Sequence, residues 1–595
     1  MERAWEERHL QAGAAPARRE APAERGVPLP WLTVEVVVYG VLALAALVVR
    51  LAALGRWPLQ ETGLNTALAA WRTLQGSDWR PAYYIPLLYD ANLLLFGLTK
   101  ASDWAARLLP ALAGSLLVIL PYFARDLLGR RGALVAALLM AFAPTWVYFS
   151  RAADGPILVA AAGALLLLSL YRYSRSREPR HLTLGVVALA VGLTAGPNFY
   201  TLLLATLLSG LIWWWQERGK DLLRRYGEVI GAAATRRNAL WFGGTLALLA
   251  TGFLVNLAGV GATAELAGRW FRTLSPASTT LSWWAYPATL ATYEFLTIGL
   301  ALVGIVSGLL RRDRVDIFLL SWVLFALLLG TALGHRESVW LVDALLPLVL
   351  LAARGLEWLW ERLAPGTELW DGLALFVLIL AVLFAAVQLG VYIHTGQVQA
   401  FRNAGFALGF VVIGWAAYWV WSGRMAAFRA GAACLLLVMM ALMVRTTTAV
   451  AYQYGADSRE SLTGNAATSM QMRDLEALIE EVSSRQAGDP RVVDIAYAPS
   501  LDPWMGWYLR EYRRADILRT VAQQADATIV IIPAQQDVQG PSGSIGQRFR
   551  WIESRPDGGF PLSFRERLRW FLLRQPVGTP RASELEVWVR LESGR

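Results

Sequence analysis

Cysteine and charge are both scarce in this sequence. Its 595 residues include one cysteine, Cys434, so no disulfide forms within one chain and a disulfide-stabilised scaffold is excluded. Charged residues make up 17% of the chain, against about 25% in soluble globular domains. Because 56% of the residues are hydrophobic and the mean hydropathy is +0.41, the chain is not soluble throughout its length.

The motifs of several common enzyme classes are also missing. No GxGxxG, GxxxxGKS/T or GxSxG motif occurs in a convincing context, and no set of Cys, His and carboxylates has the spacing of a structural zinc site. An ATP-driven transporter is therefore disfavoured. The net charge of +10 and the pI of about 9.8 are typical of nucleic-acid-binding proteins, but arginines between membrane spans give the same values. We expect membrane lipids as partners and no nucleic acid.

Long apolar runs dominate the first 450 residues. A membrane helix needs about 20 mostly apolar residues, and this length predicts about 13 spans in a transmembrane domain over residues 33–450. The predicted spans lie near 33–54, 105–122, 132–149, 156–171, 182–196, 198–215, 239–257, 286–310, 315–334, 338–353, 368–393, 406–421 and 431–447. Residues 1–32 are predicted to form a flexible cytoplasmic tail, and the first apolar run begins too late and is too long for a secretory signal.

The distribution of arginine predicts the orientation. With the N-terminus in the cytoplasm, the inside loops contain most of the arginines, for example Arg130 and Arg131 or Arg311 and Arg312, as the positive-inside rule requires. An odd number of spans then places everything after about residue 450 outside. We therefore predict an integral protein of the plasma membrane, with a cytoplasmic N-terminus and an extracytoplasmic C-terminal domain.

Two regions outside the spans are long enough to carry a function. The first is an external loop over residues 55–104, in which the short apolar segment 83–99 is predicted to form an amphipathic juxtamembrane helix at the outer interface. The second is residues 460–595, where charge rises and span-length apolar runs end. We predict a small external α/β domain there. Its expected helices are 465–486, 504–512 and 564–574, its expected strands are 492–498, 527–533 and 585–591, and 537–545 is expected to be a Gly/Pro/Ser-rich loop.

Ionisable residues at the outer ends of spans are the candidates for chemistry, because charge inside a bilayer is costly. Three are acidic: Glu61 after the first span, Asp90 in the external loop and Asp154 after the third span. The others are the tripeptide His335-Arg336-Glu337 in a short external turn, and Arg269 with Arg272 in the loop 258–285.

Each of these residues also has a purely structural explanation. An acid beside a span is usually a solvated flank, and Asp154 has the position of a cap for a helix that begins at Pro156. Arg151 has the spacing to pair with Asp154, and a lone histidine such as His335 is more often structural than a ligand. Taken together, however, the residues describe a cavity at the outer interface, in which arginines hold a phosphate and a carboxylate acts on an acceptor hydroxyl.

Several motifs in this order resemble the GT-C glycosyltransferases, membrane enzymes that use polyprenyl-phosphate-linked sugars. The family includes protein O-mannosyltransferases and lipid A aminoarabinose transferases. The motifs are Gln60-Glu61 after the first span, Tyr84-Ile-Pro86-Leu-Leu-Tyr89, Ala106-Arg107-Leu-Leu-Pro110, Ser150-Arg151-Ala-Ala-Asp154, and His335-Arg336-Glu337 before a late span. In the tail, Trp507-Tyr508-Leu509-Arg510 and Arg569-Trp570 are similar to signatures of the archaeal-type "flippase activity-associated" subgroup.

The resemblance implies a fold, a donor and a set of roles. It implies a polytopic α-helical membrane protein with a small C-terminal external α/β domain, which transfers a sugar from a polyprenyl-phosphate donor to an unknown protein, lipid or glycan acceptor. Glu61 is the implied general base, with Asp154 and Arg151 positioning the acceptor or holding a divalent metal. The remaining implied substrate contacts are Tyr84, Asp90, Arg269, Arg272, His335 and Arg336.

The sequence departs from the family at two of these positions. Gln60 stands where the family has the aspartate of an Asp-Glu pair, and the family's histidine near Pro86 is absent. An alternative hypothesis is therefore a non-catalytic transporter of lipid-linked sugars, or a scaffold of a glycan-assembly complex.

Overall fold

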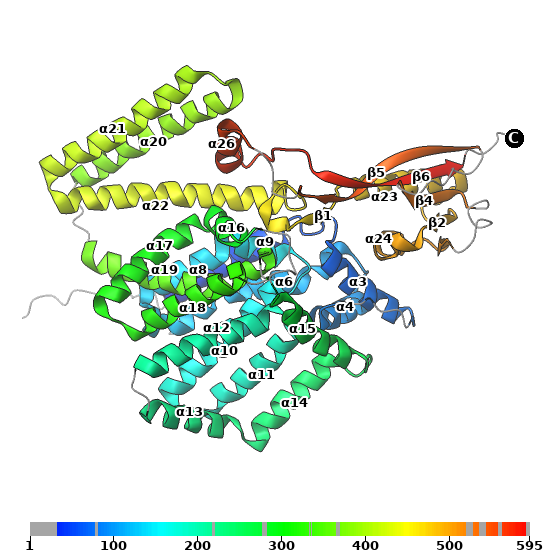
Figure 1. The fold of residues 1–595 in the computed structure, drawn as a ribbon, viewed down its shortest axis with the longest axis horizontal. Helices are drawn as coiled ribbons and strands as arrows, with labels where there is room; N and C mark the ends of the chain where they lie inside the picture. Colours follow the sequence, from blue (N-terminus) through cyan, green and yellow to red (C-terminus); the bar gives the residue numbers. More distant parts are fainter. Residues whose placement is uncertain are drawn as a thin grey trace, which may run out of the picture.

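The structure is a computed structural model that describes residues 33–590, apart from 78–80, 82, 217–219, 276–281, 333, 335, 364–368, 519–526, 535–542 and 557–561. Helices make up the part before residue 454 (Figure 1). They are α2 (Val34–Leu51), α3 (Glu61–Leu74), α4 (Pro86–Leu98), α5 (Asp103–Ala106), α6 (Leu108–Leu117), α7 (Arg125–Leu128), α8 (Arg130–Phe142), α9 (Pro144–Arg151), α10 (Pro156–Ser176), α11 (Pro179–Ala195), α12 (Asn198–Gln216), α13 (Lys220–Ala233), α14 (Arg236–Ala250), α15 (Gly259–Thr273), α16 (Ala285–Tyr293), α17 (Phe295–Arg311), α18 (Arg314–Ala332), α19 (Val342–Leu363), α20 (Leu369–Thr395), α21 (Val398–Ser422) and α22 (Arg424–Thr448).

The helices confirm an integral membrane protein. Among the described residues, nine helices are long and apolar enough to cross a membrane, and the number rises to eleven if each of two bent pairs is one span. The bent pairs are α8 with α9, at 50°, and α16 with α17, at 97°. Every predicted span falls on a helix or a bent pair. The two predicted spans outside this count are α11, with 17 residues, and α14, with 15.

Prolines begin the helices that lead to the site. Pro144, Pro156 and Pro179 stand at the first position of α9, α10 and α11, where the missing N–H costs no hydrogen bond. Pro144 also separates α8 from α9 and produces their bend. The chain between α9 and α10 is a short loop over residues 152–155.

The juxtamembrane segment forms a helix, α4, but its polar residues face inward. Asp90 is 2% exposed and Asn92 is fully buried, whereas Leu94 and Leu98 are 51% and 83% exposed. The reason is that α4 packs on α3, α11, α14 and α15, so its polar face is covered by protein. The helix is therefore not amphipathic in the sense that the sequence predicted.

The predicted α/β domain is present after residue 465. Its six strands are β1 (Ala466–Thr468), β2 (Ile495–Tyr497), β3 (Ala515–Ile517), β4 (Ile529–Pro533), β5 (Ser544–Ser554) and β6 (Arg581–Arg590), and its helices are α23 (Gln471–Ala487), α24 (Asp502–Tyr508) and α26 (Phe564–Leu573). The strand order is β1-β5-β6-β4-β2-β3. β2 is parallel to β3 and β4, and the other pairs are antiparallel.

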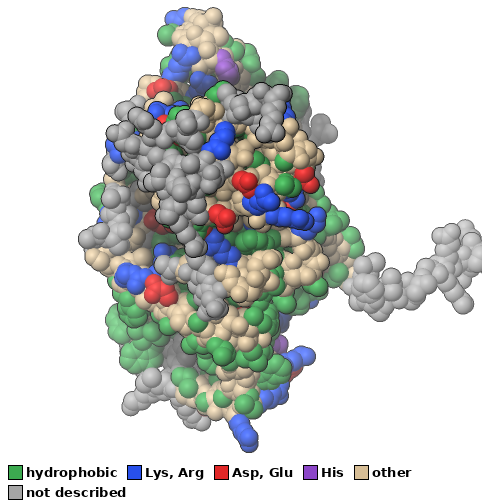
Figure 2. All heavy atoms as spheres, turned by 90° about the vertical axis from the view of Figure 1, so that its right-hand side faces the viewer, with side chains coloured by type: hydrophobic (Ala, Val, Ile, Leu, Met, Phe, Trp, Pro, Cys, Tyr) green, Lys and Arg blue, Asp and Glu red, His purple; other side chains and the backbone are tan. Residues whose placement is uncertain are grey.

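Apart from α26, which lies beside α20, the C-terminal domain lies at one end of the molecule, where α24 is next to α3 (Figure 1). Viewed from this end, charged side chains of both signs gather over the domain, while hydrophobic side chains predominate below it (Figure 2). The domain thus covers the end of the helical body from which α3 begins.

Candidate active site

A cavity of about 310 Å³ lies between the helical body and the C-terminal domain. Glu61 and Asp154 both line it, together with Glu337. Its lining also includes residues of the loop before α3, of α9, of a π-helical turn at 449–453 and of the segment 462–466, which leads into the C-terminal domain. The two carboxylates that the sequence singled out as catalytic therefore share one cavity.

Glu61 is the first residue of α3, and its side chain is exposed to the cavity. An acid in the first turn also stabilises a helix through the helix dipole. The first turn of α3 approaches the loop 152–155 very closely at Gly63. A Cβ at Gly63 would lie 2.5 Å from the carbonyl oxygen of Ala153, so only glycine allows this approach.

Asp154 lies in that loop, at the N-terminal end of α10. One oxygen, Oδ1, accepts a hydrogen bond of 2.7 Å from the N–H of Gly155. The N-cap of α10 is Gly155, which makes no side-chain capping bond. The sequence-based alternative, that Asp154 caps the helix that begins at Pro156, is therefore wrong. Burial raises the pKa of Asp154 to about 6, with Glu337 adding to the rise and Arg269 opposing it.

Arg151 lines the same cavity, but its guanidinium group is bound to the end of α2. Its terminal nitrogens donate to the carbonyl oxygens of Val49, Arg50, Ala52 and Ala53 at 2.7–3.2 Å. These oxygens are the carbonyls that the last turn of a helix leaves unpaired. Arg151 therefore joins α9 to α2 and fixes the start of the loop that carries Asp154, and its contact with substrate stays a prediction.

A second cavity, of about 340 Å³, adjoins the first and has a basic side. Arg269 and Arg272 of α15 line it. The guanidinium carbon of Arg269 lies 3.5 Å from the ring centre of Tyr83, and Arg272 forms an ion pair with Glu265. Arg269 is thus a cation held over an aromatic ring.

Four residues line both cavities: Thr62, Asp154, Glu337 and Val339. Asp154 and Glu337 are the acidic ones, so two carboxylates stand on the wall between the basic cavity and the cavity of Glu61. Burial raises the pKa of Glu337, and Arg269 opposes the rise. The arrangement can hold an anion on one side and accept a proton on the other.

Two of these lining residues, Glu337 and Tyr83, were not predicted from the sequence as site residues. Glu337 belongs to the tripeptide that was singled out, yet the basic members of that tripeptide were chosen. Tyr83 directly precedes the predicted Tyr84, and backbone at 83–85 is non-helical. The sequence shows that Tyr83 and Tyr84 are adjacent, but it does not show which of the two rings faces the site.

Three predicted site residues lie away from both cavities. Tyr84 is buried and its hydroxyl accepts a 3.0 Å bond from Asn256. Asp90 is buried within α4. Arg336 donates from Nε to the carbonyl of Thr331 at 3.2 Å. His335 lies outside the described residues.

The sequence left open whether the chain holds a divalent metal. In the described part of the chain, no group of three His, Cys, Asp or Glu side chains is close enough to hold a metal ion. A role for a metal ion stays a prediction.

The chain is similar to known membrane glycosyltransferases. Residues 86–241 match the family model of dolichyl-phosphate-mannose-protein mannosyltransferases. The structure is similar to ArnT from Cupriavidus metallidurans bound to undecaprenyl phosphate, with a TM-score of 0.54 and 14% identity over 84% of this chain and 93% of ArnT. The apo form of ArnT gives a TM-score of 0.53 over the same shares, again at 14% identity. No curated protein matches the chain in sequence.

The matched segment contains α4, the loop with Asp154 and the helices up to α14, so it includes part of the cavity wall. The similarity to ArnT extends over most of both chains. The resemblance inferred from the sequence is confirmed at the level of the fold: the chain is a membrane protein with the fold of ArnT, and its residues 86–241 match the mannosyltransferase family model.

Proposed function

We propose that the protein transfers a sugar from a polyprenyl-phosphate-linked donor to an acceptor hydroxyl. The observation that carries the proposal is the shared wall, on which Asp154 and Glu337 separate the basic cavity from the cavity of Glu61. A transferase needs such an arrangement, because the leaving phosphate and the attacking hydroxyl approach the sugar from different sides. The similarity of the fold to that of ArnT, whose structure contains undecaprenyl phosphate, supports a polyprenyl-phosphate-linked donor.

The basic cavity is the proposed donor side. Arg269 faces it and is held over Tyr83, so it is positioned before any ligand arrives. A guanidinium group binds phosphate oxygens through two parallel hydrogen bonds. Arg272 is engaged by Glu265, so Arg269 has the larger expected share in binding the phosphate.

The cavity of Glu61 is the proposed acceptor side. The acceptor oxygen forms a bond to the anomeric carbon while the bond between that carbon and the phosphate oxygen breaks. The acceptor proton passes to Glu61, and the electron pair leaves with polyprenyl phosphate beside Arg269. Asp154, on the shared wall, positions the reacting groups.

The charges of the acceptor side favour a neutral acceptor. Arg107 and Arg151 line this cavity, but both give hydrogen bonds to backbone carbonyls. The acidic side chains facing the cavity are Glu61, Asp154 and Glu337. A hydroxyl of a peptide or a neutral sugar therefore fits better than a phosphorylated lipid, which these carboxylates would repel. We place this side at the outer face of the plasma membrane, from the arginine distribution alone.

The test is release of polyprenyl phosphate by the purified full chain in nanodiscs. The donors are a panel of undecaprenyl-phosphate-linked sugars, and the acceptors are a Ser/Thr peptide, a neutral oligosaccharide and a phosphorylated lipid. We expect release that depends on Glu61, with Glu61→Gln lowering turnover about 10²–10⁴-fold and lowering the melting temperature only slightly. Glu480→Gln, on the exposed face of α23, is the matched control.

Binding of undecaprenyl phosphate without release from any donor would overturn the proposal. The transporter or scaffold hypothesis would then take its place, since the same basic cavity would hold the lipid without cleaving it.

A further inference from the structure

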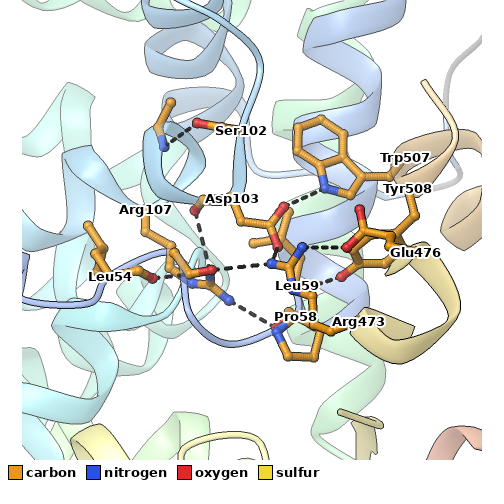
Figure 3. Close-up of polar contacts among 12 residues, drawn as sticks. Leu54, Pro58, Leu59, Ser102, Asp103, Arg107, Arg473, Glu476, Trp507 and Tyr508 are labelled. Carbon is orange, nitrogen blue, oxygen red and sulfur yellow. Dashed lines mark hydrogen bonds and ion pairs between the residues drawn. The ribbon is translucent and has the colours of Figure 1, made fainter. Parts of the chain in front are cut away.

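The C-terminal domain holds part of the loop that leads into Glu61 (Figure 3). Tyr508 of α24 accepts a hydrogen bond of 3.0 Å at its hydroxyl from the N–H of Leu59. Arg473 of α23 donates to the carbonyl of Gly55 at 3.2 Å. Only Gln60 separates the Leu59 contact from Glu61, so a shift of Tyr508 is transmitted directly to the start of α3.

The residue next to Glu61 is tied to the same domain. Gln60 is the N-cap of α3, yet its side chain makes no capping bond. Its Oε1 instead accepts a hydrogen bond of 2.9 Å from the N–H of Thr468 in β1. A side-chain amide at this position thus serves as an acceptor for a strand of the C-terminal domain.

A buried polar cluster anchors these contacts. Asp103 accepts a 2.7 Å bond from the indole N–H of Trp507 and forms an ion pair with Arg473. Asp103, Trp507 and Tyr508 are 6%, 0% and 5% exposed. From the other side, Arg107 donates to the carbonyl of Pro58 at 2.9 Å. Buried ion pairs and hydrogen bonds of this kind are costly to break and hold a single geometry.

The segment that leads into the domain also forms one wall of the cavity. Residues 462–466 line it together with Glu61, and the hydroxyl of Ser338 donates to the carbonyl of Leu462 at 2.8 Å. The segment 462–466 therefore closes the acceptor side, and the C-terminal domain that follows it contacts the loop that positions the proposed base.

We infer that the C-terminal domain is part of the active site. Tyr508 of this domain and Gln60, which is bonded to the domain, are positioning residues that hold Glu61 in reach of the acceptor. This inference rests on the proposed function. Its physical basis is that a displacement of about 1 Å of a reacting group lowers the rate by about two orders of magnitude.

The test replaces the Tyr508 hydroxyl and keeps the ring, as Tyr508→Phe in the full chain. We expect kcat for release of polyprenyl phosphate to fall about 10- to 100-fold, with KM and the affinity for undecaprenyl phosphate unchanged. Hydrogen exchange of the amides in 55–62 should become faster. Tyr512→Phe, a partly buried tyrosine of the same domain, should change none of these values.

A second pair of variants covers the case in which Tyr508→Phe lowers the melting temperature. Gln60→Leu removes the acceptor of the Thr468 bond, and Gln60→Glu retains an oxygen there. We expect kcat to fall in the leucine variant and to be restored in the glutamate variant.

Unchanged kcat in both Tyr508→Phe and Gln60→Leu would overturn the inference, even if the wild type releases polyprenyl phosphate. If the wild type releases none, the proposed function fails. Faster exchange of 55–62 in Tyr508→Phe would then still establish the positioning contact, and unchanged exchange would refute it.

Discussion

Gly63 of α3 lies against the carbonyl oxygen of Ala153, so close that a Cβ on Gly63 would stand 2.5 Å from it. This contact joins the first turn of α3, which carries Glu61, to the loop that carries Asp154. The distance between the two candidate carboxylates is therefore set by a residue with no functional group of its own.

Replacing this glycine should separate the two acidic groups. Gly63→Ala raises helix propensity by about 1 kcal/mol, so a loss of function would not come from a weaker helix. We expect polyprenyl phosphate release to fall about 10- to 100-fold as α3 moves away from Ala153. Gly97→Ala is the control, because nothing lies within 4 Å of a Cβ at Gly97, and equal activity of both variants would contradict the argument.

Asp154 should make stability depend on pH. Its pKa is raised from 3.8 to about 6 by burial, so folding favours its protonated form. The wild type is then most stable, with respect to this group, below about pH 4, and loses that stability as the pH rises through about 6. Asp154→Asn removes the titrating carboxyl group, so the variant does not lose this stability as the pH rises. We expect the variant to melt at a higher temperature than the wild type at pH 8, with a smaller difference at pH 4, by differential scanning fluorimetry in detergent; the opposite order would contradict the burial argument.

Arg269 should dominate the binding of the lipid phosphate. A hydrogen bond to a charged group contributes about 1.5–3 kcal/mol, so Arg269→Gln should weaken undecaprenyl phosphate binding about 10- to 100-fold. Titration of the lipid into nanodisc-embedded protein measures the effect. Arg485→Gln, in an exposed pair with Glu481, should bind as the wild type does, and unaltered affinity in Arg269→Gln would place the phosphate elsewhere.

The ion pair between Arg72 of α3 and Asp502 of α24 should stabilise the docking of the C-terminal domain. Its two hydrogen bonds are 2.7 and 3.1 Å long, and both side chains are largely buried. Removing one partner of a buried pair costs about 3–5 kcal/mol. We expect Asp502→Ala alone to make the segment 455–465 sensitive to protease.

The double variant Arg72→Ala with Asp502→Ala isolates the pair. Because the two partners contact each other, their effects should not add, and the coupling should be about 0.5–3 kcal/mol. A coupling near zero, as expected for exposed pairs such as Arg485 and Glu481, would show that the domain docks without this contact.

The membrane part could be predicted from the sequence because lipid imposes one requirement on every span. Backbone groups in a bilayer have no water to bind, so an apolar run of sufficient length becomes a helix.

Strand β5 was harder to predict from the sequence. Its first residues overlap the Gly/Pro/Ser-rich stretch 537–545, which predicted a loop, and only one of its eleven residues is buried. It forms because β6 pairs along its length, and that pairing is not visible in a local pattern.

The sequence by itself determined where the spans lie and which residue types were available for chemistry, since hydropathy and charge act locally. Only the tertiary structure decided which of those residues meet. Tyr83 lines the basic cavity while Tyr84, its neighbour, binds Asn256, and Asp90 is buried in α4 while Glu337 reaches the wall beside Asp154. The direction of a side chain depends on the helices and the domain packed around it, and those contacts join segments that are distant in the chain.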